Sequence, residues 1–414
     1  MLKPIYSISR FLFSLQNKFI SEPIVSVAGR VGRRGNHLCI YDAQGEVRFP
    51  LDNQDAISIG DFAVIQFEVQ KLNSKEDSIN KKALYLDHLL KIESIYKPIL
   101  APPDFHSIDG STWFSFLQKV RSHFEQLGLT EVVTPYLVKN PGMEPELEPF
   151  STVWKPSAKN SETRFLPTSP ELHMKQLIVR GHTDIFEIRT VFRNEELTEQ
   201  HRPEFKMIEW YRAYDDLTLI VSDLQSLLES LTGESMQLRK CTVAQLFQSE
   251  LDFELKPSTT LRELYNLAVE KNLKPQDNWD WNDLFHYIWV SAIESGLPKD
   301  PFLLTDYPPS QAALARINPA GWASRIELYW RGYEIANGFY ELNDPVEQRE
   351  RFLRDQKKRV EYGRTPLEID ENFMCALQMG LPPCAGMAMG LERLFMALND
   401  LSSIKQVNVN YQSY

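Results

Sequence analysis

Residues 192–214, FRNEELTEQHRPEFKMIEWYRAY, hold two runs of strand-forming side chains joined by a charged turn. Side chains alternate between the two faces of a strand. The returning run therefore places Phe205, Glu209 and Tyr211 on one face, and the preceding run adds Arg193 to it. An arginine suits an anion, an aromatic residue suits a flat ring, and a carboxylate beside a phenol suits an ammonium group. A surface ladder of ion pairs would explain the same charges, so this segment alone leaves both interpretations open.

A second segment, YEIANGFYEL (333–342), carries two carboxylates that suit a metal ion. Glu334 and Glu341 are seven residues apart, so regular alternation would put them on opposite faces. Asn337-Gly338 lies between them and predicts a break or bulge that re-aims one of the two. Two carboxylates beside a phosphate site are natural Mg²⁺ ligands, usually shared with phosphate oxygens and water.

A third segment, AGMAMGLERL (385–394), runs from glycines into a predicted helix with Arg393 in its first turn. Small residues let a nucleotide approach the backbone, and a helix N-terminus beside an arginine favours phosphate. The chain has neither a P-loop nor a dinucleotide-binding fingerprint. Together, the three segments predict an ATP site on an antiparallel sheet.

The bulk composition is typical of a globular protein with two or three domains. The chain has 414 residues, of which 43% are hydrophobic and 24% charged. Its net charge of −11 argues against a protein that mainly coats nucleic acid. The four cysteines form no CxxC pair, so we expect reduced thiols in a cytoplasmic protein. We expect no membrane span, because no apolar run reaches about 18 residues.

We expect three parts along the chain. Residues 1–22 form a basic N-terminal extension, which a transit peptide or a short amphipathic helix would explain. Residues 23–97 contain short β-rich segments between turn signals, typical of a small closed OB-like β-barrel. Residues 98–414 mix helices and hairpins without a βαβ rhythm, which predicts an α+β catalytic domain on a mainly antiparallel sheet. Within it, residues 240–300 are predicted to be helical, and the charged helix at 346–363 is predicted to be a solvated face.

The motifs, in this order, resemble those of class II aminoacyl-tRNA synthetases. FRNEELTEQHRPEFKMIEWY is similar to motif 2, GMAMGLERL to motif 3, and VVTPYL, with Pro135, to motif 1. TSPELHMKQLIVRG, YEIANGFYELND and GLPPCAG resemble the elongation factor P–lysine ligases, which branch from the lysyl group of that class. The resemblance covers about residues 105–400. It implies the class II fold, an antiparallel sheet flanked by helices, and an ATP-dependent ligase.

The resemblance also implies a role for each matching residue. Arg193 would hold the α-phosphate and the charge that develops there, and Arg393 the γ-phosphate. Phe205 would stack on adenine, while Glu334 and Glu341 would place Mg²⁺. These two glutamates and the two arginines form the implied catalytic set. The other implied ATP contacts are Asn194, Glu195, Arg202, Ile335 and Gly390.

The implied amino-acid pocket consists of residues from four separate segments. Glu171 and Glu209 would meet the two ammonium groups of a lysine-like substrate, and Glu341 would lie near it. The pocket residues are Ser169, Pro170, Glu171, Glu209, Tyr211, Asn337, Phe339, Glu341 and Ala388.

The resemblance implies that (R)-β-lysine, or lysine, is activated as an adenylate and passed to elongation factor P. Ala388 favours this acceptor, because lysyl-tRNA synthetases resemble each other in having glycine there. The barrel points instead to tRNA, although His37 and Arg48 stand where the synthetase pattern has a stacking phenylalanine and a glutamine. Arg202 stands where the ligase pattern has asparagine. The alternatives are a lysyl-tRNA synthetase with a reduced anticodon-binding domain and a non-catalytic binding or regulatory protein. Motif 1 implies a homodimer. The barrel would either brace this dimer or contact the protein acceptor.

Overall fold

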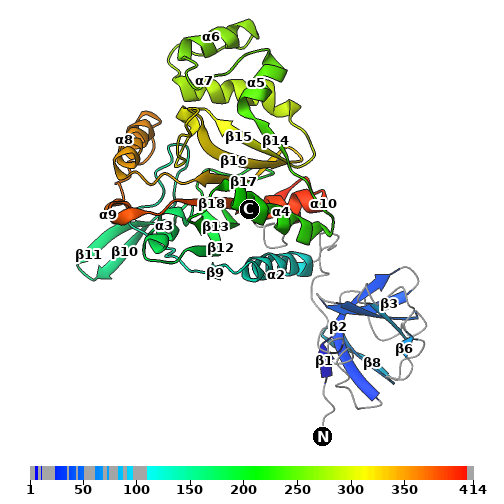
Figure 1. Cartoon of the computed structure of the whole chain (residues 1–414). Helices are drawn as coiled ribbons and strands as arrows, with labels where there is room; N and C mark the ends of the chain where they lie inside the picture. The colour runs from blue at the N-terminus through cyan, green and yellow to red at the C-terminus, as the bar shows by residue number, and fades with distance from the viewer. Residues whose placement is uncertain are drawn as a thin grey trace. The chain divides into compact units, whose positions relative to one another are not determined.

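The computed structural model describes residues 5–7, 11, 24–34, 37–42, 45–50, 61–68, 72–73, 83–86, 91–96 and 110–407. The chain divides into two compact units, Met1–Phe114 and Ser115–Tyr414 (Figure 1). Most of the predicted extension at residues 1–22 lies outside the described residues. Within the described ranges, no helix has the length and apolar character needed to cross a membrane. The four cysteines all lie in the described part, and none of them forms a disulfide there.

The N-terminal unit contains a sheet with the strand order β6-β7-β4-β3-β2-β5-β8, and β1 pairs with β2. The short connections predicted from the turn signals are present, because Arg34 pairs with His37 and Asp42 with Gly45. The OB-like fold is confirmed, but β6 and β8 do not pair within the described strands, where a closed barrel was predicted. The strands are β1 (Ile5–Ser7), β2 (Ile24–Arg34), β3 (His37–Asp42), β4 (Gly45–Pro50), β5 (Phe62–Glu68), β6 (Leu72–Asn73), β7 (Ala83–Leu86) and β8 (Lys91–Tyr96).

The second unit is built on a sheet with the order β14-β15-β16-β17-β18-β13-β12-β9. Only β14 with β15 and β9 with β12 pair in parallel among its described strands, so the mainly antiparallel sheet is confirmed. A separate hairpin, β10 with β11, projects from this unit (Figure 1). The strands are β9 (Thr130–Glu131), β10 (Ser151–Ser157), β11 (Asn160–Phe165), β12 (Asp184–Phe192), β13 (Glu204–Ala213), β14 (Arg239–Thr242), β15 (Phe302–Tyr307), β16 (Ala323–Trp330), β17 (Tyr333–Tyr340) and β18 (Cys384–Gly390).

Helices flank this sheet, as expected. Helices α4 and α10 pack on its central strands β13, β17 and β18. The helices are α2 (Gly110–Gln126), α3 (Glu171–Val179), α4 (Leu217–Thr232), α5 (Val243–Leu251), α6 (Leu261–Glu270), α7 (Trp281–Ile288), α8 (Pro345–Glu361), α9 (Glu371–Gly380) and α10 (Leu391–Asn399). A π-helical turn, Trp289–Ile293, directly continues α7.

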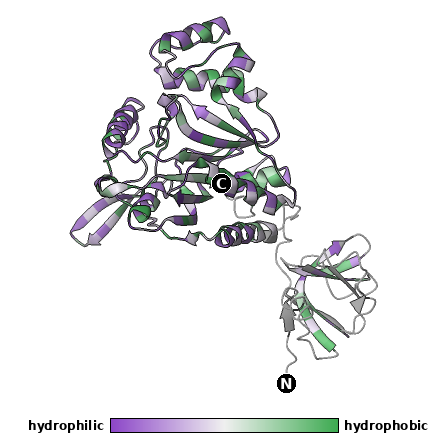
Figure 2. Ribbon diagram, in the orientation of Figure 1, coloured by the Kyte–Doolittle hydropathy of each residue, from purple (hydrophilic) through white to green (hydrophobic). Residues whose placement is uncertain are grey.

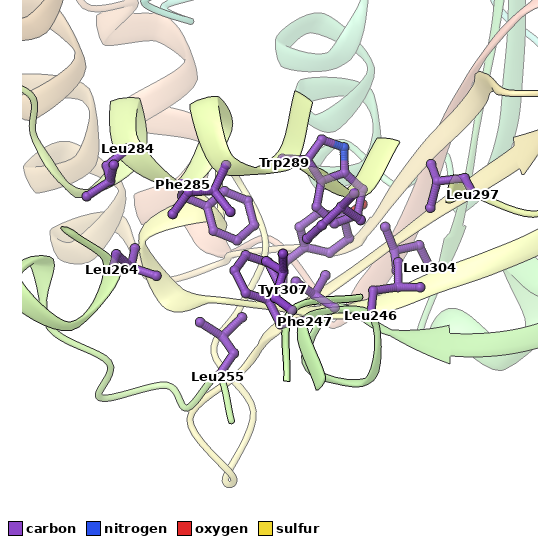
Figure 3. Close-up of a cluster of buried hydrophobic side chains, with 14 of the residues drawn as sticks. Leu246, Phe247, Leu255, Leu264, Leu284, Phe285, Trp289, Leu297, Leu304 and Tyr307 are labelled. Atoms are coloured by element: carbon purple, nitrogen blue, oxygen red, sulfur yellow. The ribbon is translucent and has the colours of Figure 1, made fainter. Parts of the chain in front are cut away.

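The predicted helical span at 240–300 folds as α5, α6 and α7. Thr242, Thr260 and Asp280 begin these helices, each in a capping box that satisfies backbone N–H groups at the helix start. Their apolar sides and strands β15 and β16 form one buried cluster, which Figure 3 shows around Phe247, Phe285 and neighbouring residues. This cluster fixes α7 at the edge of the large cleft described below.

Candidate active site

One cleft of about 1370 Å³ collects most of the predicted site residues. Ligand pockets for small molecules usually occupy roughly 300–1,000 Å³, so this cleft has room for more than one substrate. The predicted residues that line it are Ser169, Glu171, Arg193, Arg202, Phe205, Glu334, Ile335, Asn337, Phe339, Ala388, Gly390 and Arg393. Glu209, Tyr211 and Glu341 are almost completely buried beside it.

The motif 2 hairpin has the alternation predicted from the sequence. Strand β12 pairs with β13 so that Val191 faces Phe205 and Glu187 faces Glu209. Arg193 follows β12, and its backbone N–H donates to the Pro203 carbonyl at 2.9 Å. Its guanidinium lies 5.2 Å from the centre of the Phe205 ring. The buried Nε of Arg193 has no hydrogen-bond partner among the described residues, so it remains available to an anion.

Arg393 is held by a histidine to which sequence reasoning assigned no role. Its Nη2 donates to Nε2 of His201, and its Nη1 donates to the Glu334 carbonyl at 2.9 Å. Nδ1 of His201 lies 2.8 Å from Oγ1 of Thr198. Burial and the nearby charges of Arg393 and Arg193 lower the pKa of His201 to about 4. The imidazole is therefore neutral at pH 7 and can accept from Arg393.

Arg202, predicted to contact ATP, is almost completely buried at the cleft. Its Nη1 donates to the carbonyls of Thr198 at 2.6 Å and His201 at 2.8 Å. Its Nε and Nη2 have no hydrogen-bond partner in the described part of the chain. A buried donor without a partner is costly, which favours an anion at this position.

The predicted ammonium site centres on Glu209, which is only 2% exposed. One of its carboxylate oxygens accepts from the Ser169 hydroxyl at 2.9 Å, and the other accepts from the Tyr211 hydroxyl. Burial and the negative charge of Glu171 raise the pKa of Glu209 to about 8, although both hydrogen bonds oppose that rise. A buried carboxylate with this raised pKa is stabilised when a cation binds beside it.

Lys175 joins two of the predicted carboxylates, and no sequence prediction included it. Its ammonium lies 2.6 Å from Glu171 and 2.5 Å from Glu341, and its side chain is 1% exposed. Burial alone would lower the pKa of Lys175, but the two carboxylates outweigh it and raise that pKa. The Glu171–Lys175 spacing of four residues on α3 is the signal that would have indicated this pair.

Strand β18 lies between β13 and β17 and forms the floor of the predicted amino-acid pocket. Ala388 pairs with Glu209 on one side and with Asn337 on the other. The Oδ1 atom of Asn337 is buried and has no partner among the residues described. A Cβ atom on Gly386 would lie 2.3 Å from the Tyr211 ring, so only glycine fits there. The predicted pocket residues Ala388 and Asn337 therefore lie next to Glu209.

The predicted bulge in β17 is present but lies earlier than Asn337-Gly338. Opposite Leu328 and Tyr329, the register jumps from Ala336 to Glu334, so Ile335 is the extra residue. Burial and the negative charge of Glu327 raise the pKa of Glu334 to about 7. Burial also raises the pKa of Glu341, to about 8, against the opposing effect of Lys175.

The prediction that the charged helix at 346–363 is a solvated face is confirmed for only part of its surface. This helix, α8, is largely hydrophilic (Figure 2), but Gln348, Arg351 and Arg359 on it are buried. Further residues of α8 line the cleft: Arg354, Asp355, Lys357, Lys358 and Glu361. Charge composition alone does not distinguish a solvated helix from one that faces a polar cleft.

Besides the buried Glu209, Tyr211 and Glu341, three other predicted contacts do not line the large cleft. Pro170 begins α3 behind Ser169. Asn194 donates its backbone N–H to the Glu148 carbonyl at 2.8 Å. The Glu195 carboxylate accepts from Arg364 at 3.3 Å and borders a separate, smaller cavity. Their implied contacts to substrates stay predictions.

Comparisons with known proteins agree with this arrangement. A sequence model of the family described as tRNA synthetases class II (D, K and N) matches residues 113–410. An elongation factor P–(R)-β-lysine ligase from Haemophilus influenzae is 37% identical over 300 residues, covering 70% of this chain and 91% of that relative. Ligases of the same name from Mannheimia succiniciproducens and Avibacterium paragallinarum are 36% and 37% identical, again over 70% of this chain and 91% of each relative. Residues 1–112 lie outside the family match.

Proposed function

Because the chain belongs to the class II tRNA synthetase family (D, K and N), we propose that it is an ATP-dependent ligase of elongation factor P. It would activate (R)-β-lysine, or lysine, as an aminoacyl adenylate and pass the acyl group to a lysine side chain of that factor. The relatives named as such ligases support this activity. The observation that carries the proposal is the ammonium site at Glu209, because it adjoins a cleft that Arg193, Arg202 and Arg393 line.

The geometry supports an activation step that relies on positioning and electrostatics. The substrate carboxylate attacks the α-phosphorus, the new P–O bond forms, and pyrophosphate leaves with the electrons of the broken bond. Arg193, whose guanidinium lies 5.2 Å from the centre of the Phe205 ring, would meet the α-phosphate of an ATP whose adenine stacks on that ring. Arg393, fixed by His201 and the Glu334 carbonyl, would hold the γ-phosphate.

Mg²⁺ fits this site as a companion of ATP. No group of three or more potential metal ligands occurs within the described residues, so the protein offers no complete cage there. Mg²⁺ is usually bound through one or two carboxylates plus phosphate oxygens and water. Glu334 would supply one ligand, because a cation bound to it would offset the repulsion between its carboxylate and that of Glu327. Glu341 would supply a second ligand and shares its carboxylate with Lys175. The ion would neutralise phosphate charge.

Two further proposals concern the state of the protein in the cell. A homodimer through the motif 1 region is supported by apolar side chains exposed just after β9, namely Val133, Tyr136 and Leu137. The exposed Val153 and Trp154 of the β10–β11 hairpin extend the apolar surface available for such contacts. A cytoplasmic location fits an enzyme that modifies a translation factor.

Ala388→Gly should shift the choice of amino acid toward lysine. The Ala388 methyl lies between Glu209 and Asn337 on the pocket floor, so its removal changes the space beside the substrate amine. A methylene-sized change in a pocket alters discrimination by about 10- to 200-fold. We expect the preference for (R)-β-lysine over lysine, measured as the ratio of kcat/KM in pyrophosphate exchange, to fall about tenfold. An unchanged ratio would contradict the role of Ala388.

Amino-acid activation should weaken as pH falls below about 8. Only ionised Glu209 attracts an ammonium group, and its pKa in the protein is about 8. The ionised fraction, and with it kcat/KM for the amino acid in pyrophosphate exchange, should therefore fall about tenfold per pH unit below that value. The side-chain ammonium of the substrate, with an ordinary pKa of about 10.4, stays protonated in this range and does not cause the fall. A flat profile from about pH 9 to about pH 6 would exclude this role for Glu209.

The acceptor is tested by competition between elongation factor P and total tRNA. Labelled (R)-β-lysine and labelled lysine are offered in parallel with ATP and both acceptors. We expect label on the factor and none on tRNA. Label on tRNA instead would favour the alternative, a lysyl-tRNA synthetase with a reduced anticodon-binding domain. No label on either acceptor and no pyrophosphate exchange would favour a non-catalytic protein.

A further inference from the structure

An acidic group in the cleft lies apart from the carboxylates that the activation step uses. Glu144, from the segment that precedes β10, and Asp355, from α8, line the same cleft as Arg193. Neither carboxylate forms an ion pair within 4.0 Å with the residues that the structure describes. The nearby Arg351 donates to Glu347 at 3.1 Å and to the carbonyls of Ala313 and Ala315 at 2.6 and 2.8 Å. The pair therefore has no cation of its own among the described residues.

A buried hydroxyl marks the same place independently. Thr168 is 2% exposed, and its Oγ1 has no hydrogen-bond partner in the described part of the molecule. A Cβ atom built on Gly142 would lie 2.0 Å from a carboxylate oxygen of Glu144 and 2.8 Å from Oγ1 of Thr168. Both oxygens therefore face one small space. A buried acceptor without a partner favours a hydrogen-bond donor from a ligand.

The charges of neighbouring groups connect this space with the reaction centre. Burial raises the pKa of the Glu144 carboxyl, Glu171 adds to the rise, and Arg193 opposes it. Burial and the charges of Glu144 and Glu146 raise the pKa of Asp355 to about 7, while Arg354 and Arg351 oppose the rise. The charge of Glu144 is therefore coupled to those of Glu171 and Arg193, and the charge of Asp355 is coupled to that of Glu144. A cation bound between Glu144 and Asp355 would relieve their repulsion.

The number of ammonium groups in the proposed reaction indicates which cation would bind between Glu144 and Asp355. (R)-β-lysine carries two ammonium groups, and the proposed function assigns Glu209 and Glu171 to them. The third ammonium group of the reaction belongs to the lysine that receives the acyl group. The cleft also exceeds the usual size of a small-molecule pocket, which leaves room for a side chain entering from a second protein.

We propose that Glu144 and Asp355, backed by Thr168, form the site that receives the side-chain ammonium of the acceptor lysine. The inference rests on the proposed function. The acceptor nitrogen forms a C–N bond with the carbonyl carbon of the adenylate, and the bond from that carbon to the phosphate oxygen breaks. AMP leaves with that electron pair. Of the three ammonium protons one stays on the amide, and two pass through the carboxylates to solvent.

Measuring the two half-reactions separately tests this site. Glu144→Gln and Asp355→Asn should leave pyrophosphate exchange with (R)-β-lysine unchanged. Each should slow single-turnover transfer from the preformed adenylate to elongation factor P by about 10- to 100-fold, because a charge-assisted hydrogen bond is lost. Glu361→Gln is the matched control, since Glu361 lies on the same helix and lines the same cleft. It should transfer at the parent rate. Gly142→Ala should resemble Glu144→Gln, because its methyl would displace the carboxylate.

The two half-reactions distinguish a role of Glu144 and Asp355 in binding the acceptor lysine from a role in binding the amino acid. Normal exchange in the variants shows that they are folded. A raised KM for (R)-β-lysine in exchange, or an equal loss in both half-reactions, would place these carboxylates in the amino-acid pocket and overturn the inference. Transfer at the parent rate by both variants would overturn it as well. If the parent enzyme does not modify the factor, the proposed function and the inference are both wrong. If the parent is active and the variants transfer at its rate, only the inference is wrong.

Discussion

Arg193→Ala should lower pyrophosphate exchange by about 100- to 1,000-fold at saturating substrates. This is the loss typical when one group that stabilises transition-state charge is removed. Arg193 should contribute little to the fold, because its one ion pair among the described residues, with Glu196, spans 4.0 Å. Its buried Nε has no partner in the described residues, and the residue lines the cleft. Initial rates of exchange with (R)-β-lysine, measured for parent and variant, provide the comparison.

The control for this prediction is Arg239→Ala, which removes an exposed arginine of the edge strand β14 that does not line the cleft. We expect parental exchange from it. The free energy of unfolding should change by at most about 0.5 kcal/mol in both variants. If Arg193→Ala kept exchange near the parental rate, Arg193 would not be the α-phosphate ligand.

Lys175→Met should destabilise the protein by about 3–5 kcal/mol, the usual result of removing one partner from a buried ion pair. Glu171 and Glu341 would then lie close together without a cation, and Glu341 is 1% exposed. Amino-acid activation should fall too, because Glu171 would lose the partner that positions it. Urea unfolding of parent and variant measures the free-energy change, and pyrophosphate exchange measures the activity.

Lys357→Met serves as the comparison for Lys175→Met. Lys357 also pairs with a glutamate four residues away, Glu361, at 3.7 Å, but its side chain is 80% exposed. Exposed pairs contribute at most about 1 kcal/mol, so its loss should be barely measurable. Equal effects of the two substitutions would mean that Lys175 does not bridge buried carboxylates.

The motif 2 hairpin was predictable because its information is local. Alternation along a strand depends on neighbouring residues only, and it correctly grouped Phe205, Glu209 and Tyr211. The same rule indicated that β17 needs an irregularity between Glu334 and Glu341 but not where it lies. A bulge forms where the partner strand permits it, and the sequence of one strand does not contain that information.

Other residues of the site depend on contacts between distant segments. Lys175 on α3 pairs with Glu341, which follows the distant strand β17. His201 contacts Arg393 across 192 positions of sequence. Asp355 belongs to a helix whose charges are also compatible with a solvated face. These contacts follow from the tertiary arrangement, so pattern and composition along the chain did not reveal them.

The intact mass of elongation factor P after incubation with this protein, ATP and (R)-β-lysine tests the central claim most directly. We predict that the factor gains the mass of one β-lysyl group, that the gain requires ATP, and that Arg193→Ala abolishes it under the same conditions. An unchanged mass with the parent protein, while the same preparation charges lysine tRNA, would contradict the account.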